Sequence, residues 1–432
     1  MDTFNLCVAF VLVAAFGSGL TANICEDGTC SCSPDGLLIS IQCNCNATNQ
    51  HLDFNDQHFG PNMNTVSKVN ISNCDQVTFN TNSFRHLDNL QKLVVSRVRS
   101  AIFNPGVFQS LKNLTLVQIQ SLDFKQGAFM GVKELEEIEI HNSYIPQLAS
   151  HSFYDIKDLK LVSLTNVTVN VKRNAIKVEM AKTDSEVIFT DCMIRSVEEN
   201  GITVKTDTFI IRNSTVGNLA PNSITINSTE AILITQSQFN STLDSNAIHM
   251  TAPNVTIDSN VFDLLSMEIL ANINSKSNGK VIFTNNTIHD IVLGTALEKI
   301  GRALESEIDN NRFNCTCTFA KSVSLLPSVF VNNNFCLAKC KVSLNDFGTH
   351  VKNNNACDSV AALDLNAIAK CDDASERSAT ITPTHRTREG RTGFPATQIP
   401  IITTTPKSIA TTHLASTILT VSLVTLVLPQ LA

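Results

Sequence analysis

The chain has 432 residues, of which 43% are hydrophobic and only 16% are charged. A soluble domain ordinarily carries about 25% charged residues, so another feature must keep this chain in solution. The net charge of −7 excludes the basic surface that nucleic-acid binding requires, and we expect no nucleic-acid partner. Asn is frequent, with 44 residues, and the chain contains 14 Cys.

The first segment, residues 1–22, contains a short apolar run at 6–16 that is followed by small residues up to Ala22. The run is too short to cross a bilayer and is typical of a secretory signal peptide. A signal anchor is the alternative, but the residues before the run include no Lys or Arg, which argues against it. Secretion would account for the many cysteines, because disulfides persist in oxidising compartments.

A group of cysteines precedes any repeat and predicts an N-terminal cap over residues 23–65. Closely spaced Cys can also bind zinc, but secretion and a position at the end of a repeat array favour disulfides. We expect disulfides at Cys25, Cys30, Cys32 and Cys43.

A repeat follows, with apolar residues at matching positions and a spacing of 21 or 24 residues. An early turn reads Val66-x-x-Val69-x-Ile71. Four later copies each begin with Phe and continue with four aliphatic residues, the last two of which are expected to lie on a strand. These copies are Phe84, Leu87, Leu90, Leu93 and Val95; Phe108, Leu111, Leu114, Val117 and Ile119; Phe129, Val132, Leu135, Ile138 and Ile140; and Phe153, Ile156, Leu159, Val162 and Leu164.

This pattern resembles the extracellular leucine-rich repeat, which the resemblance implies should supply one short parallel strand per turn. The family places Asn or Cys after the strand, where the side chain binds backbone groups of the loop. The four Phe-marked turns have Val98, Leu122, Ser143 and Val167 there instead. Water or a different loop geometry must then satisfy those backbone groups.

After residue 170 the Phe-marked half disappears, but the strand half continues. A polar or Cys residue returns after each strand, at Cys192, Ser214, Ser237, Asn260, Asn286 and Asn311. A second alternating run, such as Ile202-x-Val204 and Ile224-x-Ile226, resembles the extra strand of a right-handed parallel β-helix. We therefore predict a β-rich solenoid over residues 66–313, with leucine-rich-repeat-like strands that grade into β-helix-like turns, about eleven turns in all.

The sequence from Asn311 to Cys317 resembles the Asn-Pro-aromatic-x-Cys-x-Cys opening of the C-terminal cap in the same family, with Arg312 in place of Pro. We expect this cap to cover residues 314–373, so that the solenoid is disulfide-capped at both ends. The pairing within this cap stays open. Cys192 remains alone and is expected to be a buried free thiol. Cys74 occupies the equivalent repeat position, so its pairing with Cys45 stays open. The predicted cap cysteines are Cys315, Cys317, Cys336, Cys340, Cys357 and Cys371.

The last two segments predict a tether. Residues 374–413 are rich in Thr, Ser and Pro, lack an apolar periodicity and predict a disordered stalk of the kind that carries O-linked glycans. Residues 414–432 form an apolar tail preceded by small residues, which is typical of a GPI signal with Ser408 or Ala410 as the anchored residue. A tail-anchored transmembrane helix is the alternative. We expect a membrane partner through this anchor, at the extracellular side of the plasma membrane.

Ten Asn-x-Ser/Thr sequences predict a glycosylated ectodomain, and glycans would replace the missing surface charge. Three of them, Asn166, Asn213 and Asn285, share one repeat position and would place glycans along one flank. The ten predicted glycosylation sites are Asn46, Asn70, Asn113, Asn166, Asn213, Asn227, Asn240, Asn254, Asn285 and Asn314.

No phosphate-binding loop, catalytic triad order or metal-binding helix motif is present, and we expect neither an enzyme nor a cofactor or metal. A carbohydrate-active β-helix enzyme is the alternative, because such enzymes place carboxylates on neighbouring strands. The candidates for that chemistry are Asp191, Arg212, Asp258 and Asp309. Isolated solvated charges need no catalytic explanation, and we favour that interpretation for these four residues.

Outward strand positions suggest a contact site instead. Ile188, Ile210 and Leu233 would form an apolar stripe on three adjacent turns, with Ile282 nearby. A polar row, with Thr190, Arg212 and Thr235, would follow beside it. The alternative is that the chain covers this stripe itself. The resemblance implies a cell-surface protein that binds an extracellular protein ligand or co-receptor in adhesion or recognition, the other alternative being a structural matrix component.

Overall fold

A computed structural model describes the cap and solenoid regions of the chain. The chain divides into two units, residues 1–379 and 380–432, and only the first contains described residues. The predicted signal peptide, stalk and apolar tail lie outside them. The described residues are 24–26, 28–45, 50–55, 58–59, 61–243, 246–266, 269, 273–292, 306–323, 328–338, 342–354 and 365.

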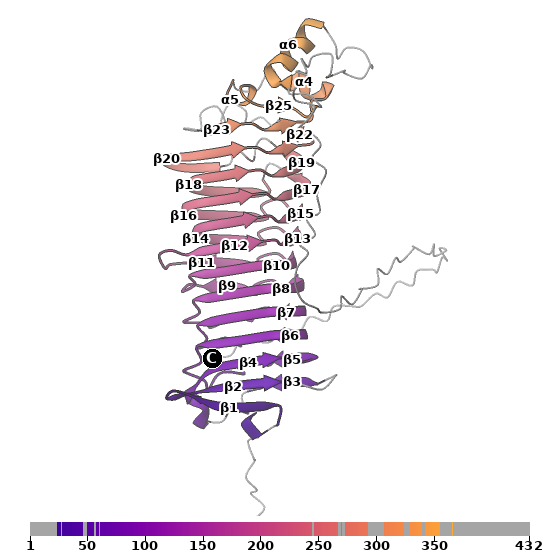
Figure 1. Ribbon diagram of the computed structural model, residues 1–432. Helices are drawn as coiled ribbons and strands as arrows, with labels where there is room; N and C mark the ends of the chain where they lie inside the picture. Colours follow the sequence, from indigo (N-terminus) through magenta and orange to yellow (C-terminus); the bar gives the residue numbers. More distant parts are fainter. Residues whose placement is uncertain are drawn as a thin grey trace, which may run out of the picture. The chain divides into compact units, whose positions relative to one another are not determined.

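The fold is a parallel β-solenoid of about 10 turns, which confirms the predicted fold class. Strands of successive turns stack directly above one another (Figure 1). The first ladder runs through the molecule from cap to cap, and neighbouring strands in it are parallel. Its strands are β2 (Leu38–Asn44), β4 (Val66–Ser72), β6 (Lys92–Phe103), β7 (Asn113–Phe124), β8 (Glu137–Leu148), β10 (Leu161–Val171), β12 (Glu186–Thr190), β14 (Ile202–Arg212), β16 (Ile224–Thr235), β18 (Ile248–Asp258), β20 (Ile273–Thr284) and β23 (Ser306–Asp309).

A second ladder lies one corner further along the chain in every turn. It includes the later halves of β6, β7, β8 and β10, because these strands continue through the corner. Its other strands are β3 (His51–Phe54), β5 (Gln76–Phe79), β13 (Met193–Val197), β15 (Thr215–Leu219), β17 (Gln238–Leu243), β19 (Val261–Ser266), β21 (Thr287–Ile288), β22 (Ile291–Val292), β24 (Arg312–Phe313) and β25 (Phe335–Cys336).

A third ladder begins at β9 (Phe153–Ile156) and continues through β11 (Ile176–Glu179). The first halves of β14, β16, β18 and β20 extend it. This ladder contains the run Ile202-x-Val204, and its presence confirms the predicted extra strand of the later turns. Before β9, turns rather than a strand occupy the third side, and there the Phe-marked half of the repeat packs its Phe and Leu side chains into the core.

One copy of the repeat is assigned wrongly by its spacing. The structure aligns Leu93 with Leu114 and Val98 with Ile119. Leu114 and Leu116 are therefore the inward strand residues, in place of Val117 and Ile119, and Ile119 rather than Leu122 follows the corner. The error arises because this copy is shorter, and its missing residues fall between the Phe-marked half and the strand.

The corner between the first and second ladders needs a left-handed backbone in each turn. The residues at this corner have φ values between 48° and 59°, and most are Asn. Asn tolerates this conformation because its side chain can hydrogen-bond locally. These corner residues are Asn73, Arg97, Gln118, Asn142, Asn166, Asp191, Asn213, Gln236, Ser259, Asn285, Asn310 and Asn333. The high Asn content of the chain is thus partly a requirement of the corner.

The residue after the corner is buried and forms a polar ladder in the later turns. Asn286 is typical of it: its Oδ1 accepts from the Asn260 backbone N at 2.9 Å, and its Nδ2 donates to the Ile257 carbonyl at 2.9 Å. In four earlier turns the strand continues through the corner, with the apolar residues Val98, Ile119 and Val167 on three of them and Ser143 on the fourth. The left-handed corner itself is the same in these turns as in the later ones.

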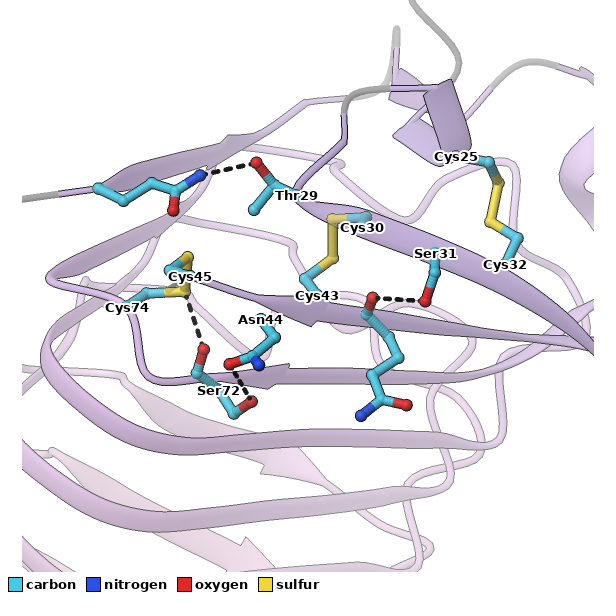
Figure 2. The surroundings of a disulfide bond; sticks show 12 residues. Cys25, Thr29, Cys30, Ser31, Cys32, Cys43, Asn44, Cys45, Ser72 and Cys74 are labelled. Atoms are coloured by element: carbon cyan, nitrogen blue, oxygen red, sulfur yellow. Dashed lines mark hydrogen bonds between the residues drawn. A yellow bond between two sulfur atoms is a disulfide. The ribbon is translucent and has the colours of Figure 1, made fainter. Parts of the chain in front are cut away.

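Disulfides secure the N-terminal end of the solenoid (Figure 2). The pairs are Cys25–Cys32, Cys30–Cys43 and Cys45–Cys74. The second joins β2 to the antiparallel edge strand β1 (Cys30–Asp35), and the first joins β1 to the short helix η1 (Ile24–Glu26). A further short helix, η3 (Pro61–Thr65), precedes β4. Such crosslinks are typical of an extracellular or secreted protein.

The C-terminal end is covered by α4 (Cys317–Val323), α5 (Ser328–Val331), the strand β26 (Val342–Ser343) and α6 (Leu344–Asn354). Cys315 pairs with Cys336, and Cys317 is also disulfide-bonded. The other three predicted cap cysteines, Cys340, Cys357 and Cys371, lie outside the described residues.

Cys192 is a buried free thiol, as predicted. Burial raises the pKa of this thiol to about 11, although hydrogen bonds from the backbone act in the opposite direction. The reactive thiolate is therefore scarce near neutral pH, and Cys192 serves as a small core residue.

Candidate functional site

The apolar stripe predicted on the first ladder is continuous in the structure. Ser163 pairs with Ile188, Ile188 with Ile210, and Ile210 with Leu233. All three aliphatic side chains point outward and are half-buried between their neighbours. Thr256 separates Leu233 from Ile282, so Ile282 belongs to the same row but does not adjoin the three. We call Ile188, Ile210 and Leu233 the apolar stripe, and the surface around it the first face.

The row on one side of the stripe is polar. Thr190, Arg212 and Thr235 pair in register on the same three turns, so the structure brings together six of the seven predicted residues, all except Ile282. The Arg212 side chain is exposed, whereas Thr190 and Thr235 are half-buried. Hydroxyls and one guanidinium thus lie directly beside the aliphatic groups, and they can supply the hydrogen bonds at the rim of a contact.

The row on the other side of the stripe was not predicted from the sequence as part of the contact site. Register places Glu186, Thr208 and Ala231 next to one another there. Thr208 and Ala231 are small and uncharged, and they widen the weakly polar area around Ile210 and Leu233. The signal was available in the alternation of the first ladder, since each of these residues lies two positions before a stripe residue.

Four predicted charges lie on or near this face, and the structure separates them. Arg212, Asp258 and Asp309 share one row, but Thr235 and Thr284 stand between them. Asp191 lies at the corner. No two carboxylates of this row therefore lie on adjacent turns.

Asp258 is instead a structural acceptor. It accepts hydrogen bonds from Thr284 Oγ1 at 2.7 Å, Asn285 Nδ2 at 2.7 Å and Ser259 Oγ at 2.9 Å. Partial burial would raise the pKa of this carboxyl, but the three hydrogen bonds outweigh it and hold the pKa below its usual value. The ionised side chain links the corner residues of two turns.

The predicted glycosylation sites fall into two groups around the face. Asn166, Asn213 and Asn285 are exposed at the corner, where each Nδ2 donates to a side-chain oxygen of the preceding turn. Asn254 differs from them, because it is exposed on the first face itself, beside Ala231. A glycan on Asn254 would limit access beyond Leu233, which leaves the apolar stripe as the open part of the face.

The remaining sequons lie elsewhere, and their occupancy stays a prediction. Asn46 lies outside the described residues. Asn70 and Asn113 are half-buried on strands of the first ladder, and Asn113 Nδ2 donates to Glu137 Oε2 at 3.0 Å. The others are exposed on the second or third ladder or just after β24, at Asn227, Asn240 and Asn314.

The chain matches no protein-family model and no curated protein. None of the helices among the described residues is long and apolar enough to span a membrane. Within the same residues, no three His, Cys, Asp or Glu side chains gather as metal ligands.

Proposed function

We propose that this protein is a cell-surface solenoid of the leucine-rich-repeat type that binds an extracellular protein partner through the apolar stripe, in adhesion, recognition or as a co-receptor. The supporting observation is the in-register row Ile188, Ile210 and Leu233, in which three outward aliphatic side chains adjoin one another on successive turns. Contiguous outward aliphatic side chains on a secreted protein mark a contact surface.

The layout of the face supports a partner of protein size. The strands hold the stripe rigidly, so little conformational entropy is lost on binding. The exposed Arg212 at its edge is a residue type enriched in protein interfaces. Glycans at the corner and at Asn254 would flank the stripe and restrict the direction from which a partner approaches.

Replacing Ile210 with Lys is expected to weaken partner binding at least about tenfold, because a buried charge would lie at the centre of the contact. The measurement is proximity labelling by the full chain displayed on cells, with wild type and I210K compared. The matched control is Val94→Lys, since Val94 occupies the same outward, half-buried row on β6, far from the stripe. Equal labelling by all three proteins would contradict the proposal.

We also propose that the tail 414–432 directs a GPI anchor at Ser408 or Ala410. Treatment of intact cells with a phosphatidylinositol-specific phospholipase should release most of the protein into the medium, because the enzyme cleaves the lipid from the anchored chain. Retention of the protein on the cells would favour the tail-anchored helix instead.

A further inference from the structure

A hollow of about 750 Å³ opens beside β9, at the level where the third ladder begins. Its walls include Gly127, Met130, Gly131, His151 and Tyr154. We call it the β9 hollow. Its volume is in the range of small-molecule binding sites, about 300–1,000 Å³.

Gly127 lies in the wall of the hollow, at a second left-handed corner of the solenoid. That corner also carries Gly106 and His151, and in other turns it carries Asn82, Asn174, Asn200 and Asn222. Where Asn is present, its side chain can bond to a neighbouring turn, as Asn82 Oδ1 does in accepting from Gln109 Nε2 at 2.8 Å. Gly127, with φ 74°, has no side chain that could form such a bond.

The walls of the β9 hollow expose apolar surface that the rest of the solenoid buries. Met130 is 63% exposed and Tyr154 is 39% exposed. Among the described residues only five large hydrophobic side chains are exposed, and these two both line the hollow. Apolar side chains that gather in a concave site on an otherwise polar surface favour an apolar ligand.

Two nitrogen-bearing side chains lie beside Tyr154. The Lys177 ammonium lies 5.2 Å from the centroid of the Tyr154 ring. Glu179, two residues further along β11, forms its ion pair with Lys205, and Lys177 adds a weaker electrostatic attraction to that carboxylate. The His151 ring packs edge-on against Tyr154, with the ring centroids 4.8 Å apart. Its Nδ1 is buried and has no hydrogen-bond partner among the same residues. An anionic acceptor would complement both groups.

We propose that the β9 hollow binds a small amphipathic carboxylate. The apolar body of the ligand packs against Met130 and Tyr154. Its carboxylate lies toward Lys177, and the imidazole of His151 can turn to donate to it. This site lies on the third side of the solenoid and is independent of the partner surface on the first face.

The test is a calorimetric titration of the full chain with naphthoate. Naphthalenemethanol, which has a similar shape but no charge, serves as the second probe. We expect saturable binding of naphthoate and weaker binding of the alcohol. Lys177→Met keeps the apolar stem and should weaken naphthoate binding about tenfold, while leaving the alcohol unchanged, because only a charge-assisted contact is lost. Met130→Ser should weaken both probes.

Controls separate the hollow from general surface binding. Lys92→Met removes an exposed ammonium from the first face, and Met193→Ser removes an exposed Met from the second ladder, so both should leave naphthoate binding unchanged. Thermal unfolding of each variant checks its fold, and since Lys177, Lys92 and Met193 are all exposed we expect unaltered midpoints. Absence of saturable naphthoate binding to the wild type overturns the proposal. So does equal loss in the control variants.

Discussion

Replacement of Asn286 with Leu is expected to lower the free energy of unfolding by at least about 3 kcal/mol, because it leaves several buried polar groups without partners. Asn286 Oδ1 accepts from the Asn260 backbone N, and Nδ2 donates to both the Ile257 carbonyl and Asn311 Oδ1, at 2.9 Å in each case. Leucine is of similar size but can replace none of these bonds. Urea unfolding followed by circular dichroism measures the loss.

The effect should also be local, because each turn of a solenoid contacts only its neighbours. Backbone amide exchange in β18, β20 and β23 should accelerate in N286L, whereas exchange in β6 and β7 should change little. The control is Asn218→Leu, since Asn218 is exposed on β15 and its replacement should change stability by less than about 0.5 kcal/mol. An equal loss in both variants would show that the polar ladder is not the cause.

Phe103→Ala is expected to destabilise the earlier turns by about 3–5 kcal/mol, through lost apolar burial and the cavity that remains. Phe103 is fully buried, and its ring stacks between Phe79 and Phe124 at centroid distances of 4.6 and 5.2 Å. It also contacts Phe108 at 5.1 Å. The truncation thus opens a void in the middle of an aromatic stack that spans several turns. Chemical unfolding of the purified variant measures the loss.

Phe103→Leu is the matched control for this stack. Leucine retains most of the buried volume, so it should cost less than half as much as alanine. A similar cost for the two substitutions would mean that the aromatic stack, rather than the volume, stabilises this region. A negligible cost for both would contradict the view that the Phe-marked turns depend on this core.

The solenoid was predictable from the sequence because buried apolar residues recur at the same positions in every turn. Phe84, Leu93 and Val95 and their counterparts must all point inward, and no other arrangement buries them together. The third ladder was also visible, in Ile202-x-Val204. The prediction that Val117 is an inward strand residue was wrong. In this shorter copy of the repeat, both Leu114 and Val117 satisfy the apolar spacing, so the sequence allowed two alignments with the preceding copy. Only the pairing of Leu93 with Leu114 resolves it.

The candidate surfaces were less predictable, because they depend on which residues of different turns become neighbours. A capped, repetitive β-fold, the seven cap cysteines among the described residues and the row of outward Ile and Leu could all be predicted from the sequence. The shared face of Asn254 and Leu233, the pairing of Cys45 with Cys74 and the hollow lined by Gly127 and Tyr154 could not. These relations arise from contacts between turns more than twenty residues apart, whereas inward burial follows from the alternation of side chains within each turn.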